Sequence, residues 1–328
     1  MSSEPAPFAA PRRALVLIAA VTLAVALLAP LVGSHPVSLR ELLSGDAAAA
    51  TILWQLRLPR VLLALLAGGM LALTGLSLQT LFANALAEPY TLGVASGASL
   101  GAALVFTFAP AGMPLGLPLA ALAAFAGALA ATGVVVALGR GGSGAGLLLA
   151  GVAVALLCQA VILLLQYLSD ASGTLRMVRW MMGGLAIVGW REPLWLVPWL
   201  LLALAAHLLR RWDLDLLLAG EEVAASRGVP VGRLRLGLLV VDSLAVAALV
   251  AVVGPIGFVG LMVPHMLRRL VGPLHSALVP ACALGGGAFL VLCDLLARTA
   301  LAPAELPVGI VTALLGAPFF LWLLRRRA

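Results

Sequence analysis

Residues 61–81 read VLLALLAGGMLALTGLSLQTL, an uncharged run that follows Arg57, Pro59 and Arg60. A helix needs ~20 consecutive apolar residues to cross the hydrocarbon core of a bilayer, so this run predicts a membrane-spanning helix. Nine further apolar runs cover roughly residues 14–32, 91–108, 117–138, 145–167, 193–209, 234–253, 257–270, 278–297 and 307–324. The sequence therefore predicts an all-α polytopic membrane protein with about ten transmembrane helices, in a single domain over residues 1–328.

The composition indicates the same class. Of the 328 residues, 63% are hydrophobic and 10% are charged, whereas an average soluble domain is roughly 45–50% apolar and about 25% charged. So few polar side chains cannot cover the surface of a soluble globule of this size. The composition thus excludes an ordinary cytosolic enzyme, a disordered chain and a secreted disulfide scaffold. The net charge of +7 is more typical of membrane orientation signals than of a nucleic-acid partner, and we expect no such partner.

The sequence lacks the residues that several kinds of chemistry require. All 20 basic residues are arginine, so there is no lysine for a Walker-type phosphate site, and we expect no ATP hydrolysis by this chain alone. Cys158, Cys282 and Cys293 lie in apolar runs without a CxxC pair, and we expect no metal site. The stretch 97–101 reads GASLG and fits a hydrolase pattern, but it lies inside a predicted span. Together with Gly93 it instead predicts a helix face for close packing.

The arginines predict the orientation of the chain. With ten spans both termini lie on one side, and we place them in the cytoplasm, where positively charged loops are retained. Thirteen arginines then lie inside: Arg12, Arg13, Arg140, Arg210, Arg211, Arg227, Arg233, Arg235, Arg268, Arg269, Arg325, Arg326 and Arg327. Seven lie outside: Arg40, Arg57, Arg60, Arg176, Arg179, Arg191 and Arg298. The outer arginines either cap helices and contact headgroups, or form an electropositive face for an acidic partner or anionic cargo.

Residues 210–233 form the longest inside loop. Within this loop, Ala219–Arg227 is predicted to form a short helix that ends at Gly228 and Pro230. A helix on the cytoplasmic face has no lipid in which to bury itself, so it faces either solvent or a partner protein.

Residues 169–192 form an outside segment that carries Arg176 and Arg179, which would share one face of a helix. Trp180 and Met181 follow directly. Aromatic and methionine surface beside two guanidinium groups suits a flat, partly apolar anion that bears carboxylates. The alternative is that Trp and Arg anchor the segment at the membrane interface.

Two carboxylates fall inside predicted spans. Asp294 lies one turn before Arg298, which predicts an i,i+4 ion pair. Asp242 has no obvious local partner, and buried membrane carboxylates are candidates for function. A proton-coupled secondary transporter that uses Asp242 is therefore a different-class alternative, and a purely structural membrane scaffold is another.

Several motifs resemble one family of bacterial membrane proteins. They are Leu58-Pro59-Arg60, Asn84-Ala85-Leu86-Ala87-Glu88-Pro89, residues 147–152, Trp180-Met181-Met182-Gly183-Gly184, residues 254–261 with Pro264 and His265, and Asp294 to Arg298 followed by residues 305–310. From about Trp54 to its C-terminus, the chain is similar to the iron-chelate, haem and cobalamin permeases of type II ABC importers.

This resemblance implies a multi-pass permease of the bacterial inner membrane that works as a homodimer. Two copies of a cytoplasmic ABC ATPase would drive it with ATP and magnesium, and one periplasmic binding protein would deliver the cargo. The permease itself would be no enzyme and would bind no cofactor.

The resemblance also implies roles for individual residues. The substrate pathway would include Arg176, Arg179, Trp180 and Met181, and the binding protein would dock on Arg57, Arg60 and Arg298. The cytoplasmic gates would be formed by Asn84, Leu86, Ser143 and Gly144. The coupling helix for the ATPase would use Ala219, Gly220, Glu221, Glu222, Ala225 and Arg227. The segment 169–192 would form the periplasmic entrance.

Two positions depart from the family pattern. Ala85 stands where the family usually has proline, which removes a rigid φ at the inner gate. Arg179 stands before Trp180, where the family more often has an aromatic residue. Haem presents two propionates on a flat apolar ring, whereas the periphery of cobalamin is largely neutral amides. The extra guanidinium therefore favours haem as cargo, with cobalamin or a ferric siderophore as alternatives.

Overall fold

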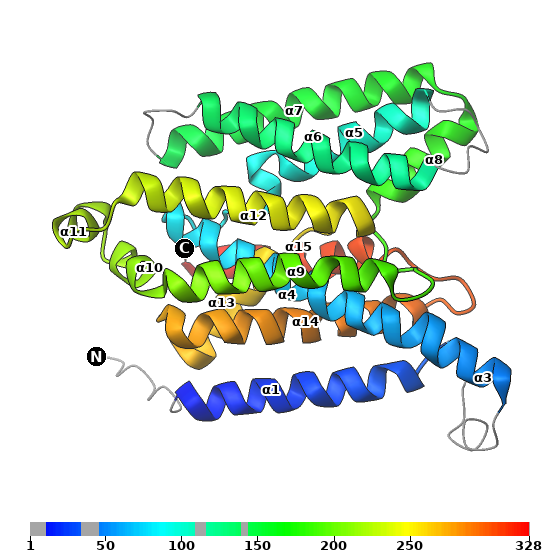
Figure 1. Cartoon of the computed structure of the whole chain (residues 1–328), viewed down its shortest axis with the longest axis horizontal. Coiled ribbons are helices and arrows are strands. Elements are labelled where there is room, and N and C mark those ends of the chain that lie inside the picture. Colours follow the sequence, from blue (N-terminus) through cyan, green and yellow to red (C-terminus); the bar gives the residue numbers. More distant parts are fainter. Residues whose placement is uncertain (1–10, 34–45, 109–115, 139–143, 328) are drawn as a thin grey trace.

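The computed structural model describes residues 11–33, 46–108, 116–138 and 144–327, which fold into a bundle of helices (Figure 1). In chain order the elements are α1 (Pro11–Leu28), η1 (Ala29–Leu31), α3 (Ala47–Thr51), η2 (Ile52–Arg57), α4 (Leu58–Leu81), η3 (Pro89–Leu92), α5 (Val94–Phe108), α6 (Gly116–Leu138), α7 (Gly144–Leu168), α8 (Ala171–Met181), α9 (Arg191–Leu209), α10 (Arg211–Leu218), α11 (Glu221–Ser226), α12 (Val231–Val253), α13 (Val259–Val271), α14 (His275–Thr299) and α15 (Val308–Arg327). These ranges contain no strand, which confirms the all-α prediction.

Each of the ten predicted apolar runs coincides with a helix. Within the described residues, seven helices are long and apolar enough to cross a membrane: α1, the continuous helix 47–81 that ends in α4, α6, α7, α9, α12 and α14. The shorter apolar helices are α5 and α15. The run 257–270 forms the shortest helix of the ten. Its helix, α13, has 13 residues and is therefore ~20 Å long, against a hydrocarbon core of ~30 Å.

Helix α4 is the centre of the bundle. Every residue from Leu66 to Leu81 is buried, and α4 packs against α9, α12, α13 and α14. By contrast α6, α7 and α9 bury only a minor share of their residues and present large aliphatic side chains such as Leu122, Leu156 and Leu201 to the outside. These outer helices thus expose apolar surface, as expected for helices that face lipid or another membrane-embedded subunit.

Glycines allow the closest helix contacts. A Cβ atom on Gly68 of α4 would collide with the backbone carbonyl of Gly286 in α14. On α5, Gly97 and Gly101 contact the α6 backbone in the same way, which confirms the predicted close-packing face. Gly93 is different: it precedes α5 with a φ of +74° and so serves a turn. Small residues have this function because lipid supplies no hydrophobic drive between helices, so close packing contributes much of what holds them together.

The extramembrane helices lie at opposite ends of the molecule. In Figure 1, α10 and α11 lie at the end where α1 begins, and α3 and α8 lie at the other end. The loop 210–233 contains the expected short helix as α11, flanked by Gly220 with φ +115° and Gly228 with φ +85°. It also contains α10, which was not predicted. The two groups of described arginines, inner and outer, therefore belong to opposite ends, and the assignment of one end to the cytoplasm stays a prediction.

A substitution at Gly68 tests the backbone contact between α4 and α14. We expect Gly68→Val to lower the thermal unfolding midpoint of the purified protein sharply, because overpacking costs ~1–3 kcal/mol even where side chains can yield and here backbone must move. The matched control is Gly133→Val in α6, where a Cβ atom meets nothing within 4 Å. Equal midpoints for the two variants would contradict this account of the packing.

Candidate functional site

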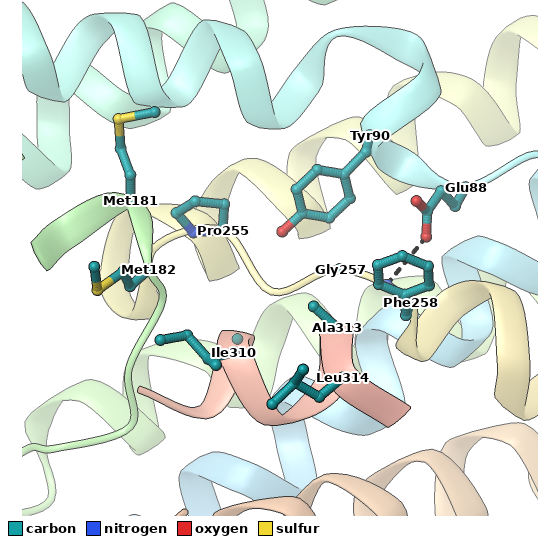
Figure 2. A pocket seen from close by; sticks show the side chains of 11 residues that line it. Glu88, Tyr90, Met181, Met182, Pro255, Gly257, Phe258, Ile310, Ala313 and Leu314 are labelled. Carbon is teal, nitrogen blue, oxygen red and sulfur yellow. Dashed lines mark hydrogen bonds between the residues drawn. The ribbon is translucent and has the colours of Figure 1, made fainter. Parts of the chain in front are cut away.

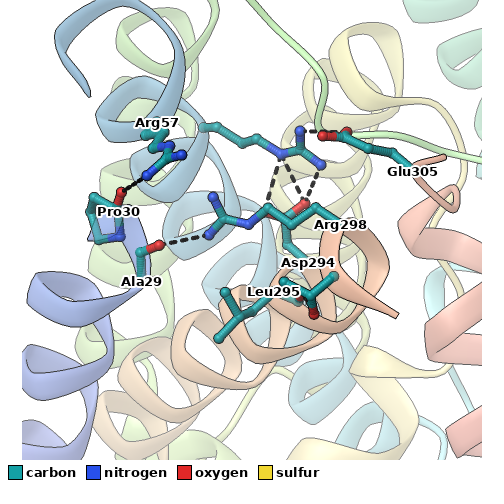
Figure 3. Close-up of polar contacts among 9 residues, drawn as sticks. Ala29, Pro30, Arg57, Asp294, Leu295, Arg298 and Glu305 are labelled. Atoms are coloured by element: carbon teal, nitrogen blue, oxygen red, sulfur yellow. Dashed lines mark hydrogen bonds and ion pairs between the residues drawn. The ribbon is translucent and has the colours of Figure 1, made fainter. Parts of the chain in front are cut away.

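Three of the outer arginines lie together where η2, α4 and α14 meet (Figure 3). Arg60 holds Asp294 through an Nη2–Oδ1 contact of 2.8 Å and Glu305 through an Nη1–Oε2 contact of 2.8 Å. Arg298 donates to the carbonyl of Ala29 at 2.9 Å, and its Nε lies 3.5 Å from Asp294. The predicted pair of Asp294 and Arg298 is therefore confirmed, but Arg60 is the nearer partner of Asp294.

This arginine cluster, Arg57, Arg60 and Arg298, lines a pocket of about 470 Å³. Arg57 donates to the carbonyl of Pro30 at 3.0 Å, and both Arg57 and Arg298 are buried. Three guanidinium groups face the two carboxylates of Asp294 and Glu305, so the cluster keeps one net positive charge. An acidic side chain of a partner would enter a preformed pocket of fixed guanidinium groups rather than meet mobile surface cations.

Helix α8 carries the predicted pathway residues at the same end of the molecule. Asp170 caps the helix, because its carboxylate accepts from the hydroxyl of Ser172 and from the backbone N–H of Gly173, both at 2.7 Å. These two hydrogen bonds lower the pKa of Asp170. The side chains of Arg176 and Arg179 are exposed, as expected for a pair on an accessible helix face.

The pathway residues do not all share that face. Trp180 turns toward the interior, where its ring makes an edge contact with Phe106 at a centroid distance of 6.5 Å. Met181 and Met182, at the C-terminal end of α8, line a second pocket. The structure thus divides these residues: Trp180 and Met181 are half-buried and pack against core clusters, whereas Arg176, Arg179 and Met182 are exposed.

This second pocket has a volume of about 540 Å³ and a mostly apolar lining. Besides the two methionines it is lined by Glu88, Tyr90, Pro255, Gly257, Phe258, Gly309, Ile310, Ala313 and Leu314. In Figure 2 the methionines lie on one side, Glu88 and Phe258 on the other, and Tyr90 directs its hydroxyl toward the middle. Pockets of this size bind small molecules in other proteins.

Glu88, Tyr90 and Phe258 are pocket residues to which sequence reasoning assigned no role. Glu88 and Phe258 belong to the motifs that carry the family resemblance, so those motifs were the sequence signal that could have identified them as site residues. The backbone N–H of Phe258 donates to Glu88 Oε2 at 3.3 Å. Phe258 has a φ of +69°, a strained conformation for a bulky residue that is typical of functional sites.

The predicted gate residues form two groups in the sequence, Asn84 with Leu86 and Ser143 with Gly144. The first group lies in the loop that follows α4. Asn84 Oδ1 accepts from the backbone N–H of Leu86 at 2.9 Å, which closes an Asx turn around Ala85. This turn restrains the position where the family's proline is missing. Of the second group, Ser143 lies outside the described residues, and Gly144 is the first residue of α7.

The predicted coupling residues are displayed on the short helix α11 and its flanks. Ala219, Gly220, Glu221, Glu222, Ala225 and Arg227 are all exposed, whereas Ala224 is buried beneath them. The helix therefore presents one accessible face with two carboxylates and one arginine. Contact of this face with an ATPase stays a prediction.

Asp242 has a partner that the sequence did not indicate. His207 of α9 approaches Asp242 of α12, with its Nε2 atom 3.4 Å from Oδ1. Both side chains are buried, and neither lines the two pockets described above. The arrangement therefore corrects the expectation of a carboxylate without a partner and separates Asp242 from both pockets.

Comparisons with known proteins agree on one family. A sequence model described as the FecCD transport family matches residues 18–326. The chain is 44% identical over 280 residues to the hemin transport system permease protein HmuU of Yersinia pestis, covering 83% of this chain and 82% of that protein. It is 42% identical over 291 residues to the vitamin B12 import system permease protein BtuC of Salmonella paratyphi A, covering 86% of each.

A solved structure of an inward-facing, metal-chelate type ABC transporter has the same fold. It superposes with a TM-score of 0.85 at 32% identity and covers 96% of this chain and 99% of that one.

A substitution at Asp294 tests the arginine cluster. We expect Asp294→Asn to destabilise the protein by about 3–5 kcal/mol, because Arg60 and Arg298 lose a buried countercharge. The matched control is Asp213→Asn, which breaks the largely exposed pair with Arg210 and costs ~0–1 kcal/mol. Thermal unfolding in detergent measures both, and an equally small effect at Asp294 would contradict the proposed countercharge.

Proposed function

Because this chain belongs to the FecCD transport family and is the permease of an ABC importer in the haem, vitamin B12 and iron-chelate group, we propose that its own cargo is haem. The observation that carries this proposal is the pair of exposed guanidinium groups, Arg176 and Arg179, on the helix whose last residues line the apolar pocket. Haem needs both features, since it combines a flat apolar ring with two carboxylates.

The pocket supports a cargo with an apolar face. Its lining combines thioether, aromatic and aliphatic side chains, represented by Met182, Phe258 and Ile310, with one carboxylate from Glu88. Guanidinium groups bind carboxylates through paired, charge-assisted hydrogen bonds. Cobalamin would leave those groups facing mostly neutral amides. The relatives support the two cargoes almost equally, at 44% and 42% identity, so the argument for haem rests on α8.

The assembly proposed for this importer is a homodimer with two ATPase copies and one periplasmic binding protein. ATP and magnesium act at the ATPase, so this chain supplies the pathway and no catalytic group. In a homodimer, the two copies of α8 contribute four arginines to the entrance. Such a permease resides in the bacterial inner membrane, and we place its two termini and α10–α11 in the cytoplasm.

The partner contacts follow from the same placement. The binding protein docks at the outer end, where the pocket of Arg57, Arg60 and Arg298 accepts carboxylates. The ATPase contacts the exposed face of α11 at the inner end. Between them, the loop with Asn84 and Leu86 closes the pathway on the cytoplasmic side, together with residues 143–144 at the start of α7.

Proton-coupled secondary transport is the alternative that Asp242 suggested. Its burial against His207, away from both pockets, argues for a structural pair between α9 and α12. We therefore assign the driving force to ATP.

The proposal is tested by reconstituting the permease with its ATPase and binding protein in proteoliposomes and offering haem, cobalamin and a ferric siderophore. We expect haem uptake that vanadate blocks and an uncoupler leaves intact. Uptake of only cobalamin or the siderophore would contradict the cargo. Uptake that resists vanadate and collapses with the uncoupler would contradict the ABC mechanism.

The arginine pair gives a separate prediction. We expect the double variant Arg176→Ala and Arg179→Ala to lower haem uptake by at least about tenfold, since a hydrogen bond to a charged group contributes ~1.5–3 kcal/mol, and to leave any cobalamin uptake unchanged. Arg191→Ala is the control, because Arg191 is also exposed at the outer end but lies at the start of α9. Unchanged haem uptake in the double variant would refute the propionate contact.

A further inference from the structure

The last turn of α4 is bonded to the cytoplasmic helices by two separate routes. This turn ends at Leu81, and residues 82–88, here called the gate loop, follow directly. One route reaches the hydroxyl of Thr80, and the other reaches the carbonyl of Leu81. Both contacts lie immediately before the gate loop.

The first route runs through His275, the first residue of α14. Its backbone N–H and its ring Nδ1 both lie against Asp215 Oδ1 of α10, at 2.8 and 2.7 Å. Its ring Nε2 lies 3.1 Å from Thr80 Oγ1. The ring is fully buried, so it forms a short polar connection from α10 to α4 that is largely shielded from solvent.

The second route runs through Arg235 of α12. A single guanidinium nitrogen, Nη2, donates to the carboxylate of Glu221 in α11 and to the carbonyl of Leu81 at 3.3 Å. The side chain of Arg235 is 11% exposed and that of Glu221 is 60% exposed, so this bridge is shielded from solvent at its α4 end and open to solvent at its α11 end. The coupling helix and the end of α4 therefore share one arginine.

The two routes end on neighbouring residues of one helix. Helix α10 packs against α11, α4 and α14, and α11 packs against α12. A displacement of α10 and α11 must therefore either break these polar contacts, which is unfavourable where they are buried against α4, or move the last turn of α4. The gate loop would then move as well, because it begins at that turn with Ala83 held at a φ of +47°.

We propose that His275 and Arg235 are positioning residues that transmit the movement of α10 and α11 to the gate loop through the last turn of α4. The proposal rests on the proposed function, in which an ATPase moves α11. If Asp215 only caps α14 and Arg235 only caps α4, these contacts stabilise the two helices and do nothing more. If they transmit movement, the gate loop must also respond to nucleotide.

The test breaks each route at one residue and pairs it with a matched control. Arg235→Met removes the bridge, and Arg233→Met alters an exposed arginine two residues away. Thr80→Val removes the contact with His275. Thr74→Val removes an equally buried hydroxyl of α4 that bonds only within its own helix, to the carbonyls of Met70 and Leu71.

The readout is the reactivity of a cysteine placed in the gate loop, Leu86→Cys. Leu86 is exposed, and the three native cysteines are buried, so a maleimide reports on the new thiol. In the complex with the ATPase, we expect ATP and vanadate to change the labelling rate several-fold in the parent and both controls. We expect less than half of that change in labelling rate in Arg235→Met and in Thr80→Val, and the smallest change in the variant that combines the two. A response equal to that of the controls would overturn the proposal.

A measurement on the permease alone separates this inference from the proposed function. If the parent complex shows neither a nucleotide response nor transport, the proposed function fails. Hydrogen exchange of the gate-loop amides then still tests the routes: it should rise in Arg235→Met and Thr80→Val and stay unchanged in Arg233→Met and Thr74→Val. Equal exchange in all four variants would show that the routes do not hold the gate loop.

Discussion

The contact of the α4 backbone with its neighbours, at Gly68 against α14 and at Gly75 against α13, is the constraint on which the rest of the structure depends. In lipid, apolar side chains gain nothing by leaving the solvent, so helices adhere through close packing and shared polar contacts. Glycine permits that packing only where a carbonyl of the neighbour fits against it. The rotation and depth of α4 relative to α13 and α14 are consequently fixed at these two contacts.

The fixed α4 connects the two ends of the molecule. Its first turn carries Arg60 and thus belongs to the outer arginine cluster, while its last turn carries Thr80 and leads into the gate loop. A rigid buried helix transmits displacement with little loss, because a close-packed interior has no free volume to absorb it. The arginine cluster proposed for docking and the proposed gate loop are therefore joined by one element.

The sequence was sufficient for what depends on local composition and spacing. The ten apolar runs, the short helix between Gly220 and Gly228, the close-packing glycines of α5 and the pair of Asp294 with Arg298 all follow from residues within one or two turns. Contacts between distant segments did not follow. Arg60 contacts Glu305, which lies 245 positions later in the chain, and no local sequence pattern predicts that pairing.

Other differences arose where tertiary packing overrides a local rule. Trp180 sits beside two exposed arginines in the sequence, yet its ring packs against Phe106 of α5 because burying an indole excludes more apolar surface than leaving it in the entrance. The run 257–270 is too short for a full span, and its first two residues lie outside α13, which begins at Val259. Phe258, with its φ of +69°, lies just before that helix and contributes to the apolar pocket.

The use of arginine at both outer sites has two different physical consequences. In the cluster, carbonyls of η1 and two carboxylates hold the guanidinium groups in fixed positions, which suits a partner that must dock in one orientation. On α8, Arg176 has only long contacts of 3.4 Å, and its side chain is free to follow a moving ligand. A transport site must bind its cargo well enough to accept it and weakly enough to release it. In the proposed pathway, exposed arginines would meet that requirement because solvent and salt screen their attraction, whereas the buried cluster is screened less.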